Sequence, residues 1–311
     1  MLLYDRLEKT DFSQPTAVCL GFFDGVHLGH QAVLNAAVRQ DGLLPAVFSF
    51  PEHPQDVLTG KAVLKITDLP RKIELFERFR IQAAAIVPFA QVREMPPEEF
   101  VTMLRERMNA RVVCMGSDFR FGRERSGDAE TMRRLCQACE MTCIVVPPVE
   151  HGGRKVSSTA IRLDIATGRM LQATEMLGHS FTLRAPVLHG QQLGRLLGFP
   201  TINQPLPDEL VPPKHGVYLS YAIFDGLAHP SVTNVGVRPT VHPGQPVCET
   251  HIFNYSGELY GTSPQLALTN FLRPERQFAD LNALQAAVRQ DMLTALAMHK
   301  ALQDGGITTL C

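Results

Sequence analysis

Two histidines in a glycine-rich stretch are the residues whose type and spacing most directly suggest chemistry. His27 and His30 lie in the segment 21–30, which follows the apolar run 17–20 and precedes an alanine-rich run with helical spacing, 31–39. This order predicts a strand, a turn and a helix. Such a turn brings backbone N–H groups and the positive end of a helix together, which suits a phosphate. Both imidazoles can then donate hydrogen bonds to phosphoryl oxygens as charge builds on them.

Two further loops of the first half carry groups of the same kind. Asp118 and Arg120 follow the apolar run 111–115. Their loop can be a turn that packs two Phe rings, or its carboxylate can hold Mg²⁺ or the nucleotide and its guanidinium can meet phosphate. The hydroxyl-rich segment 157–159, between Lys155 and Arg162, precedes a helical pattern. Its serines can simply cap that helix, or they can join the two cations in binding the phosphates of ATP.

The second half carries a different set of groups. Thr201 and Asn203 follow Pro200, which favours extended neighbours, so their side chains project to the same face of a strand. Their neutral oxygens suit Mg²⁺, which takes few protein ligands and keeps phosphates and water. Glu249, taken by its residue type alone, is better explained as a solvated glutamate on a strand.

The elements that position the first set alternate between strand and helix patterns. Strands are predicted at 17–20, 45–50, 83–87, 111–115 and 141–146, and helices at 31–39, 69–79, 96–108 and 128–140. Residues 51–54 read as a loop because they hold two prolines. The alternation predicts an α/β fold with a parallel, Rossmann-like sheet. Ligands bind at the carboxyl ends of such strands, and both the histidine turn and the Asp118 loop follow a strand.

The pattern changes near residues 178–182, so we expect domains at 1–180 and 181–311. Beyond the change, runs at 217–224 and 227–232 flank Asp225-Gly226, a type I′ hairpin signal, and another strand is predicted at 265–272. These runs predict a small antiparallel β-barrel. A closing helix is predicted at 278–300, with an apolar side of Leu281, Leu284, Ala287, Val288, Leu293, Leu296 and Ala297.

Composition narrows the class of protein. The 311 residues carry a net charge of -1, which gives no global field for nucleic acid or an anionic membrane surface. No apolar run is long enough to span a bilayer, the amino terminus does not resemble a signal peptide, and seven cysteines fit a reducing compartment. We therefore expect a cytoplasmic protein, with neither nucleic acid nor a membrane as partner; self-association stays open.

Three cysteines admit two interpretations. Cys136, Cys139 and Cys143, with His151 nearby, could bind zinc, but their spacing also equals one face of a helix that runs into a strand. The second interpretation, buried core thiols, is favoured because there is no second tight pair of ligands. A Walker A ATP site is excluded, since the chain has no Gly-x-x-x-x-Gly-Lys-Ser/Thr stretch.

The first half resembles a known family. Residues 23–31 (FDGVHLGHQ) are similar to the amino-terminal domain of bacterial bifunctional riboflavin kinase/FAD synthetase, and His27-Leu28-Gly29-His30 resembles the HxGH signature of the nucleotidylyltransferase superfamily. The segments 118–122 (DFRFG) and 157–162 (SSTAIR) resemble later signatures in the family's order. Phe22 departs from the family pattern, which usually has asparagine after Gly21.

The second half is similar to the riboflavin kinase part of that family. Residues 194–203 (GRLLGFPTIN) resemble its signature, and 234–240, 249–252, 259–261 and 271–275 resemble further motifs. The resemblance implies catalytic roles for His27, His30 and Glu249. It implies ATP or FMN binding in the first domain by Gly21, Phe23, Asp24, Gly25, His27, His30, Asp118, Arg120, Gly122, Lys155, Ser157, Ser158, Thr159 and Arg162. It implies ATP or flavin binding in the second domain by Gly190, Gly194, Arg195, Gly198, Phe199, Pro200, Thr201, Asn203, Asn234, Arg238, Glu249 and Arg273.

The implied activity has two steps. The second domain phosphorylates riboflavin to FMN with ATP, and the first adenylylates FMN with ATP to give FAD and pyrophosphate. Mg²⁺ is the expected cofactor, with Thr201, Asn203 and Asp118 as ligands. Two alternatives are a flavin-binding regulator with degenerate sites and a cytidylyl transferase with another acceptor. The intact polar residues argue against the first, and the kinase-like second half argues against the second.

Overall fold

The computed structural model describes residues 1–190, 194, 198–237 and 246–304. The chain divides into two compact units, Met1–Ser158 and Thr159–Cys311, which are described separately below. The domain boundary expected after residue 180 stays a prediction.

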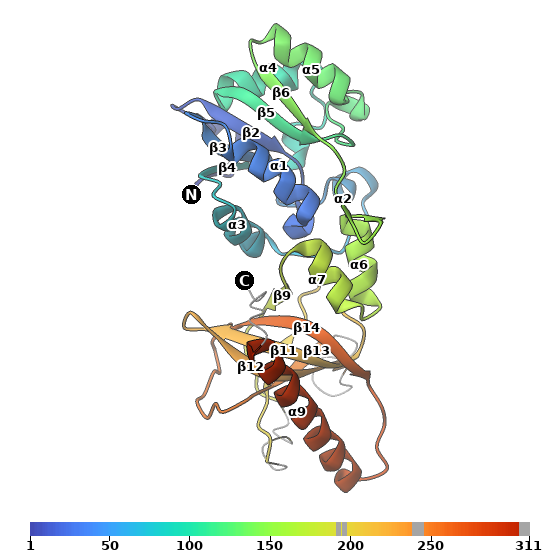
Figure 1. Cartoon of the computed structure of the whole chain (residues 1–311). Coiled ribbons are helices and arrows are strands. Elements are labelled where there is room, and N and C mark those ends of the chain that lie inside the picture. The colour runs from blue at the N-terminus through green and yellow to red at the C-terminus, as the bar shows by residue number, and fades with distance from the viewer. Residues whose placement is uncertain (191–193, 195–197, 238–245, 305–311) are drawn as a thin grey trace. The chain divides into compact units, whose positions relative to one another are not determined.

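The first unit contains a six-stranded parallel sheet (Figure 1). Its strands, in spatial order, are β1 (Leu2–Tyr4), β4 (Ala83–Ile86), β3 (Leu44–Ser49), β2 (Thr16–Leu20), β5 (Ala110–Gly116) and β6 (Thr142–Val146). The five predicted strands are confirmed, and the α/β class with them. The sequence reading missed β1, which has three residues and lies at the edge of the sheet, too short and too exposed to form a pattern.

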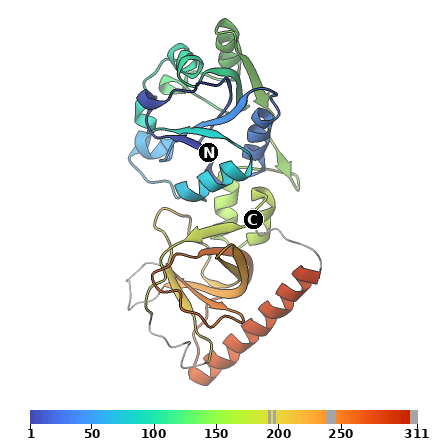
Figure 2. The ribbon, with the colours of Figure 1, turned by 90° about the vertical axis from the view of Figure 1, so that its left-hand side faces the viewer.

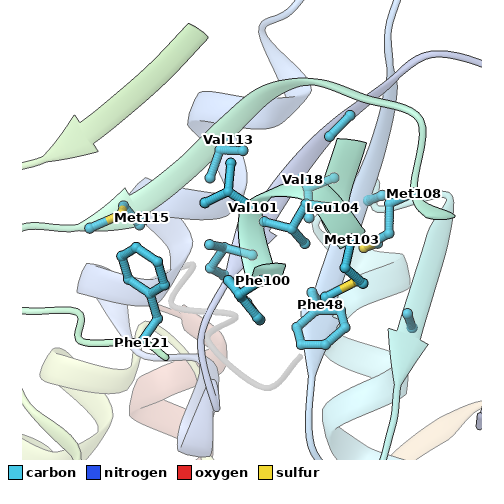
Figure 3. Close-up of a cluster of buried hydrophobic side chains, with 14 of the residues drawn as sticks. Val18, Phe48, Phe100, Val101, Met103, Leu104, Met108, Val113, Met115 and Phe121 are labelled. Atoms are coloured by element: carbon cyan, nitrogen blue, oxygen red, sulfur yellow. The ribbon is translucent and has the colours of Figure 1, made fainter. Parts of the chain in front are cut away.

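Helices cover both faces of this sheet. On one face, α1 (Leu28–Val38) and α3 (Leu69–Arg78) share a buried cluster with the strands. On the other, α4 (Pro97–Arg107) and α5 (Ala129–Ala138) do the same; Figure 3 shows Phe100, Val101 and Leu104 of α4 packed on strand residues. Successive strand residues alternate between the two clusters, because side chains along a strand point to opposite faces.

The proline-containing segment at 51–54 differs from its predicted structure, whereas the three clustered cysteines agree with theirs. The loop predicted at 51–54 is followed at once by a short helix, α2 (Pro54–Thr59), so Pro54 starts a helix instead of continuing the loop. Proline is favoured at that first helical position, where its missing N–H costs nothing. Cys136 is buried in the α4/α5 core, and Cys139 and Cys143 pack against it, as predicted for core thiols.

The second unit, from Thr159 on, holds all but the first residue of α6 (Ser158–Ala166), and α7 (Met170–Leu177) follows; the helical run breaks at Gly168 as predicted. A six-stranded antiparallel sheet follows. Its strands, in spatial order, are β10 (Ile202–Pro205), β13 (Pro246–Ile252), β12 (Leu227–Val237), β11 (Gly216–Phe224), β14 (Gln265–Pro274) and β9 (Phe181–Arg184). The sheet curls as a barrel does (Figure 2), and its edges are bridged: Leu188 N donates to Asn203 O at 2.9 Å.

The hairpin turn lies where the sequence predicts it, whereas the closing helix begins at a different residue. Asp225 and Gly226 have φ of 51° and 74°, so the predicted hairpin turn is confirmed. The closing helix α9 (Leu281–Asp304) starts later than predicted. Asp280 sets that start, since its Oδ1 accepts the Ala283 N–H at 2.8 Å.

The predicted apolar side of α9 is partly wrong. Leu281, Leu293 and Leu296 are 58%, 56% and 41% exposed, and Ala297 is exposed as well. The buried positions are Ala287, Ala295 and His299. The docked face also carries Met292, Met298 and Leu302, which pack against the barrel core. Leu281, Leu293 and Leu296 lie off this face, because helix docking selects which part of a broadly apolar helix is buried. No described helix combines the length and apolar character that crossing a bilayer requires.

Candidate active sites

His27 and His30 lie against each other at the start of α1. His27 occupies the N-cap position, and its Nδ1 accepts the backbone N–H of His30 at 3.3 Å. The two rings stack with centroids 3.6 Å apart and planes inclined by 14°. Since Nδ1 of His27 is an acceptor, the neutral ring carries its proton on Nε2.

His30 is held in the uncharged form. Burial lowers its pKa well below the ordinary value of 6.5, and the nearby His27 and Lys72 lower this pKa further. Its Nδ1 is buried and has no hydrogen-bond partner among the described residues. His30 can therefore offer a neutral N–H donor to an anion but supplies little permanent positive charge.

The turn before the histidines is braced from within the protein. Phe23 has φ of 57° and packs its ring edge-on to His30 at 5.2 Å. The buried Asp24 accepts the N–H groups of Ile66 and Thr67 through Oδ1, at 2.8 and 3.3 Å. Asp24 therefore anchors the turn to the segment before α3. Gly21 follows β2 directly, and Gly25 donates its N–H to Thr67 at 3.1 Å.

The topology brings a second loop to the same edge of the sheet. β2 and β5 are adjacent and parallel, and the strand order runs away from them in opposite directions. That is a topological switch point, the usual ligand site in such sheets. Asp118 follows β5 and accepts a hydrogen bond from Lys155 Nζ at 2.9 Å, which is the main cause of its lowered pKa.

The remaining residues predicted to bind ATP or FMN in the first domain come from the Asp118 loop and from the segment around the start of α6. Arg120 pairs with Asp128, the N-cap of α5, at 3.0 Å. Gly122 has φ of 72° in the same loop. Ser158 Oγ, at the end of the first unit, donates to the Asp24 carbonyl at 3.0 Å, and Ser157 precedes it. Thr159 and Arg162 belong to the second unit, where Arg162 Nη2 donates to Thr159 Oγ1 at 3.5 Å.

The polar residues of the second unit form a row across the barrel sheet. Asn203 of β10 lies opposite Glu249 of β13, which lies opposite Asn234 of β12. The row continues through Val217 of β11 to Arg273 of β14. Residues directly opposite each other share a face of the sheet, so five strands present these side chains on one side.

A pocket of about 200 Å³ opens on that face. Its lining includes the predicted residues Gly194, Phe199, Thr201, Asn234, Glu249 and Arg273. An apolar wall opposite the polar row comes from Phe278 and from Leu284 and Val288 of α9. The pocket can therefore hold a ligand with one flat apolar part and one polar part.

Glycines and prolines shape the approach to the row. A Cβ on Gly190 would lie 2.6 Å from Asn203 Nδ2, so the backbone there approaches the carboxamide as closely as glycine allows. The Pro200 carbonyl lies 2.8 Å from Nδ1 of His251, and Gly198 has φ of 86°. Arg195 and Arg238 lie outside the described residues.

Two family models match the chain in tandem. The FAD synthetase model matches residues 9–160, and the riboflavin kinase model matches residues 177–299. A bifunctional riboflavin kinase/FMN adenylyltransferase from Listeria monocytogenes is 32% identical, over 96% of this chain and 96% of its own length. This chain belongs to the bifunctional riboflavin kinase/FMN adenylyltransferase family.

Other relatives agree with this assignment. The Escherichia coli enzyme of the same description is 33% identical over 89% of this chain and 90% of its own length. The Pseudomonas fluorescens enzyme is 34% identical over 90% and 91%. A solved structure from Streptococcus pneumoniae, described as a macrolide-efflux protein, has a TM-score of 0.87 at 26% identity and covers 94% of this chain and 98% of its own. The protein is thus a riboflavin kinase and FMN adenylyltransferase, with the FAD synthetase domain first.

The structure of this riboflavin kinase/FMN adenylyltransferase also brings in residues that the sequence reading did not single out. Asp291 of α9 accepts two hydrogen bonds from Arg273, at 2.8 and 2.6 Å, and both side chains line the pocket. Glu275 accepts a hydrogen bond from Asn234 Nδ2 at 3.4 Å. A polar residue at 291 inside an otherwise apolar helical stripe was a signal for the first. Glu275 lies in the segment 271–275, which resembles a family motif, but no role was predicted for it.

Proposed function

We propose that the two activities use the two sites described above. FMN adenylylation takes place at the histidine turn and the Asp118 loop, and riboflavin phosphorylation takes place on the polar row of the barrel. The observation that carries the second assignment is the direct pairing of Asn203 with Glu249 inside one row. The first assignment is supported by the stacked histidines at a switch point of the parallel sheet.

In the kinase step, Glu249 is the general base. It takes the proton of the ribityl 5′-hydroxyl of riboflavin as that oxygen attacks the γ-phosphorus of ATP, and ADP leaves. A primary alcohol is a poor nucleophile, so a positioned carboxylate contributes substantially to the rate. The apolar wall of Phe278, Leu284 and Val288 offers a surface for the isoalloxazine ring.

In the adenylylation step, no base is needed. An oxygen of the FMN phosphate, already an anion, attacks the α-phosphorus of ATP, and pyrophosphate leaves. The protein therefore has to align two anions and stabilise the charge that develops between them. The N–H groups of His27 and His30 do this at the turn, assisted by Lys155 of the same unit.

Mg²⁺ fits the donor set of the barrel. The hydroxyl of Thr201 and the carboxamide oxygen of Asn203 are hard neutral donors, and Asn203 is confined by Gly190 on one side while Glu249 lies opposite it. Thr201 and Asn203 would hold the ion in the kinase domain, and Asp118 would hold one in the first domain. Bound there, Mg²⁺ supplies charge neutralisation for the phosphates of ATP.

We also propose a cytoplasmic location, supported by free thiols at all six described cysteines.

Product analysis of paired variants tests the assignment. The purified chain is incubated with ATP, Mg²⁺ and either riboflavin or FMN, and FMN and FAD are separated. Glu249→Ala should abolish FMN formation and spare FAD formation from supplied FMN. The double variant His27→Ala/His30→Ala should do the converse. Loss of both activities from either folded variant would contradict separate sites.

A further inference from the structure

A lysine lies buried behind the histidine turn. Lys72 of α3 is only 3% exposed, on the same face of the helix as the buried Leu75 and Phe76. Burying an ammonium group is costly unless hydrogen bonds replace its water. A lysine at this position therefore calls for an explanation beyond packing.

The ammonium group of Lys72 joins the ends of two strands. Nζ donates to the carbonyl of Phe22 at 3.1 Å and to the carbonyl of Phe50 at 2.8 Å. Phe22 lies just after β2, and Phe50 just after β3, the neighbouring parallel strand. Ser49 Oγ adds a hydrogen bond to the Phe22 carbonyl at 3.2 Å. The ammonium group thus donates to two backbone carbonyls just beyond the paired parts of β2 and β3, where hydrogen bonds between these strands have ended.

The same ammonium also lies over an aromatic ring. Its distance to the ring centroid of Phe22 is 4.2 Å, within cation–π range. The Phe22 ring in turn meets the ring of His53, the N-cap of α2, edge-on at 4.8 Å. Lys72 therefore holds Phe22 by both its backbone and its side chain.

The contacts of Lys72 with Phe22 also affect the histidine pair, because the residue after Phe22 packs against His30. Phe22 precedes Phe23, whose ring packs on His30 at 5.2 Å. A shift of the Phe22 carbonyl would move Phe23 and with it the surface against which His30 rests. The charge of Lys72 also acts on His30 directly, and together with His27 it disfavours protonation of that ring.

We propose that Lys72 is a positioning residue for FMN adenylylation: its ammonium group clamps the strand ends at Phe22 and Phe50 and thereby fixes the turn that presents His27 and His30. The inference rests on the proposed assignment of adenylylation to that turn. Lys72 has no contact with substrate in this account, because its ammonium group is enclosed by the protein.

The variant Lys72→Met tests the clamp, because it keeps the length of the side chain and removes the charge. We expect kcat for FAD formation from FMN to fall by about 10- to 100-fold, since small misplacements of reacting groups cost rates of this order. The KM for FMN should change less than the kcat. The acid limb of the pH–rate profile should move to higher pH, because His30 protonates more easily without the lysine. FMN formation by the kinase domain of the same chain should be unchanged.

Two further variants make the result decisive. Lys61→Met removes an exposed lysine near α2 and should behave as wild type. Lys72→Arg keeps the charge but cannot place a single nitrogen between two carbonyls, so kcat should be intermediate and the acid limb should stay in place. If Lys72→Met does not fold, the arginine variant decides alone. A wild-type kcat in either folded variant would overturn the inference.

The failure of this inference and that of the proposed function are distinguishable. If adenylylation persists in His27→Ala/His30→Ala, the site assignment itself is wrong. If that double variant is inactive while Lys72→Met retains the wild-type kcat and pH profile, only the role of Lys72 is wrong.

Discussion

Asn203 and Glu249 lie directly opposite each other on the antiparallel strands β10 and β13. The pairing puts a neutral oxygen donor and a carboxylate on one face of the sheet, beside the pocket that Thr201 and Arg273 also line. Directly paired side chains lie only about 5 Å apart, so the metal ligand and the general base proposed above would be immediate neighbours.

Gly190 is predicted to be essential for the position of Asn203. In Gly190→Ala the new Cβ would lie 2.6 Å from Asn203 Nδ2, so the carboxamide has to move. We expect FMN formation to fall about 10-fold or more, comparable to the loss when a group that orients a metal ligand is removed. FAD formation from supplied FMN, measured in the same preparation, is the control. Unchanged kinase kinetics would show that Asn203 needs no fixed position.

Thr201 is predicted to set the Mg²⁺ requirement of the kinase. Thr201→Val keeps the shape of the side chain and removes the hydroxyl oxygen, so the Mg²⁺ concentration for half-maximal FMN formation should rise by about 10-fold or more. Titration of Mg²⁺ after chelation with EDTA measures it. Thr294→Val, at an exposed position of α9, is the matched control. Equal Mg²⁺ requirements in the two variants would remove Thr201 from the metal site.

The Arg273–Asp291 ion pair is predicted to dock α9 on the barrel. Both side chains are mostly buried, at 22% and 13% exposed, and the pair is bidentate. Asp291→Asn should therefore lower the unfolding free energy of the second unit by about 2 kcal/mol. This loss lies between the losses typical of breaking an exposed and a fully buried ion pair. The KM for riboflavin should rise as well, because the helix carries Leu284 and Val288 into the pocket wall.

A double-mutant cycle separates this pair from general packing. Arg273→Met, Asp291→Leu and the double variant are compared by denaturant unfolding, and a coupling energy of about 1 kcal/mol or more is expected for residues in direct contact. Glu258→Gln, at an exposed glutamate, is the control for surface charge. Additive effects would mean that α9 is docked by its apolar contacts alone.

His30 is predicted to make the first unit less stable in acid. Its folded-state pKa is lowered below 6.5 by burial, so the unfolded chain binds a proton at a pH where the folded chain does not. The stabilisation from uncharged His30 is thus fully present above about pH 6.5 and is lost as the pH falls toward the folded pKa. Unfolding free energies measured from pH 7.5 to 5.5 should fall more steeply in wild type than in His30→Asn. Parallel curves would contradict the burial of an uncharged ring.

The local parts of both sites could be predicted from the sequence because they depend on residues close together in the chain. His27 and His30 meet because an N-cap residue and the third helical residue are neighbours in any α-helix. Asp225-Gly226 gives its turn because both residues tolerate positive φ. The alternation of strands and helices likewise predicted the parallel sheet and the edge at which the loops gather.

Only the tertiary structure decided what depends on distant pairing. The opposition of Asn203 and Glu249, the ion pair of Arg273 with Asp291 and the exposed leucines of α9 all follow from strand register and helix docking. These are set by contacts between segments far apart in the chain, which no local periodicity records. Lys72 belongs here too: its position in an apolar stripe was visible in the sequence, but the two carbonyls that hold its ammonium group come together only when neighbouring strands pair.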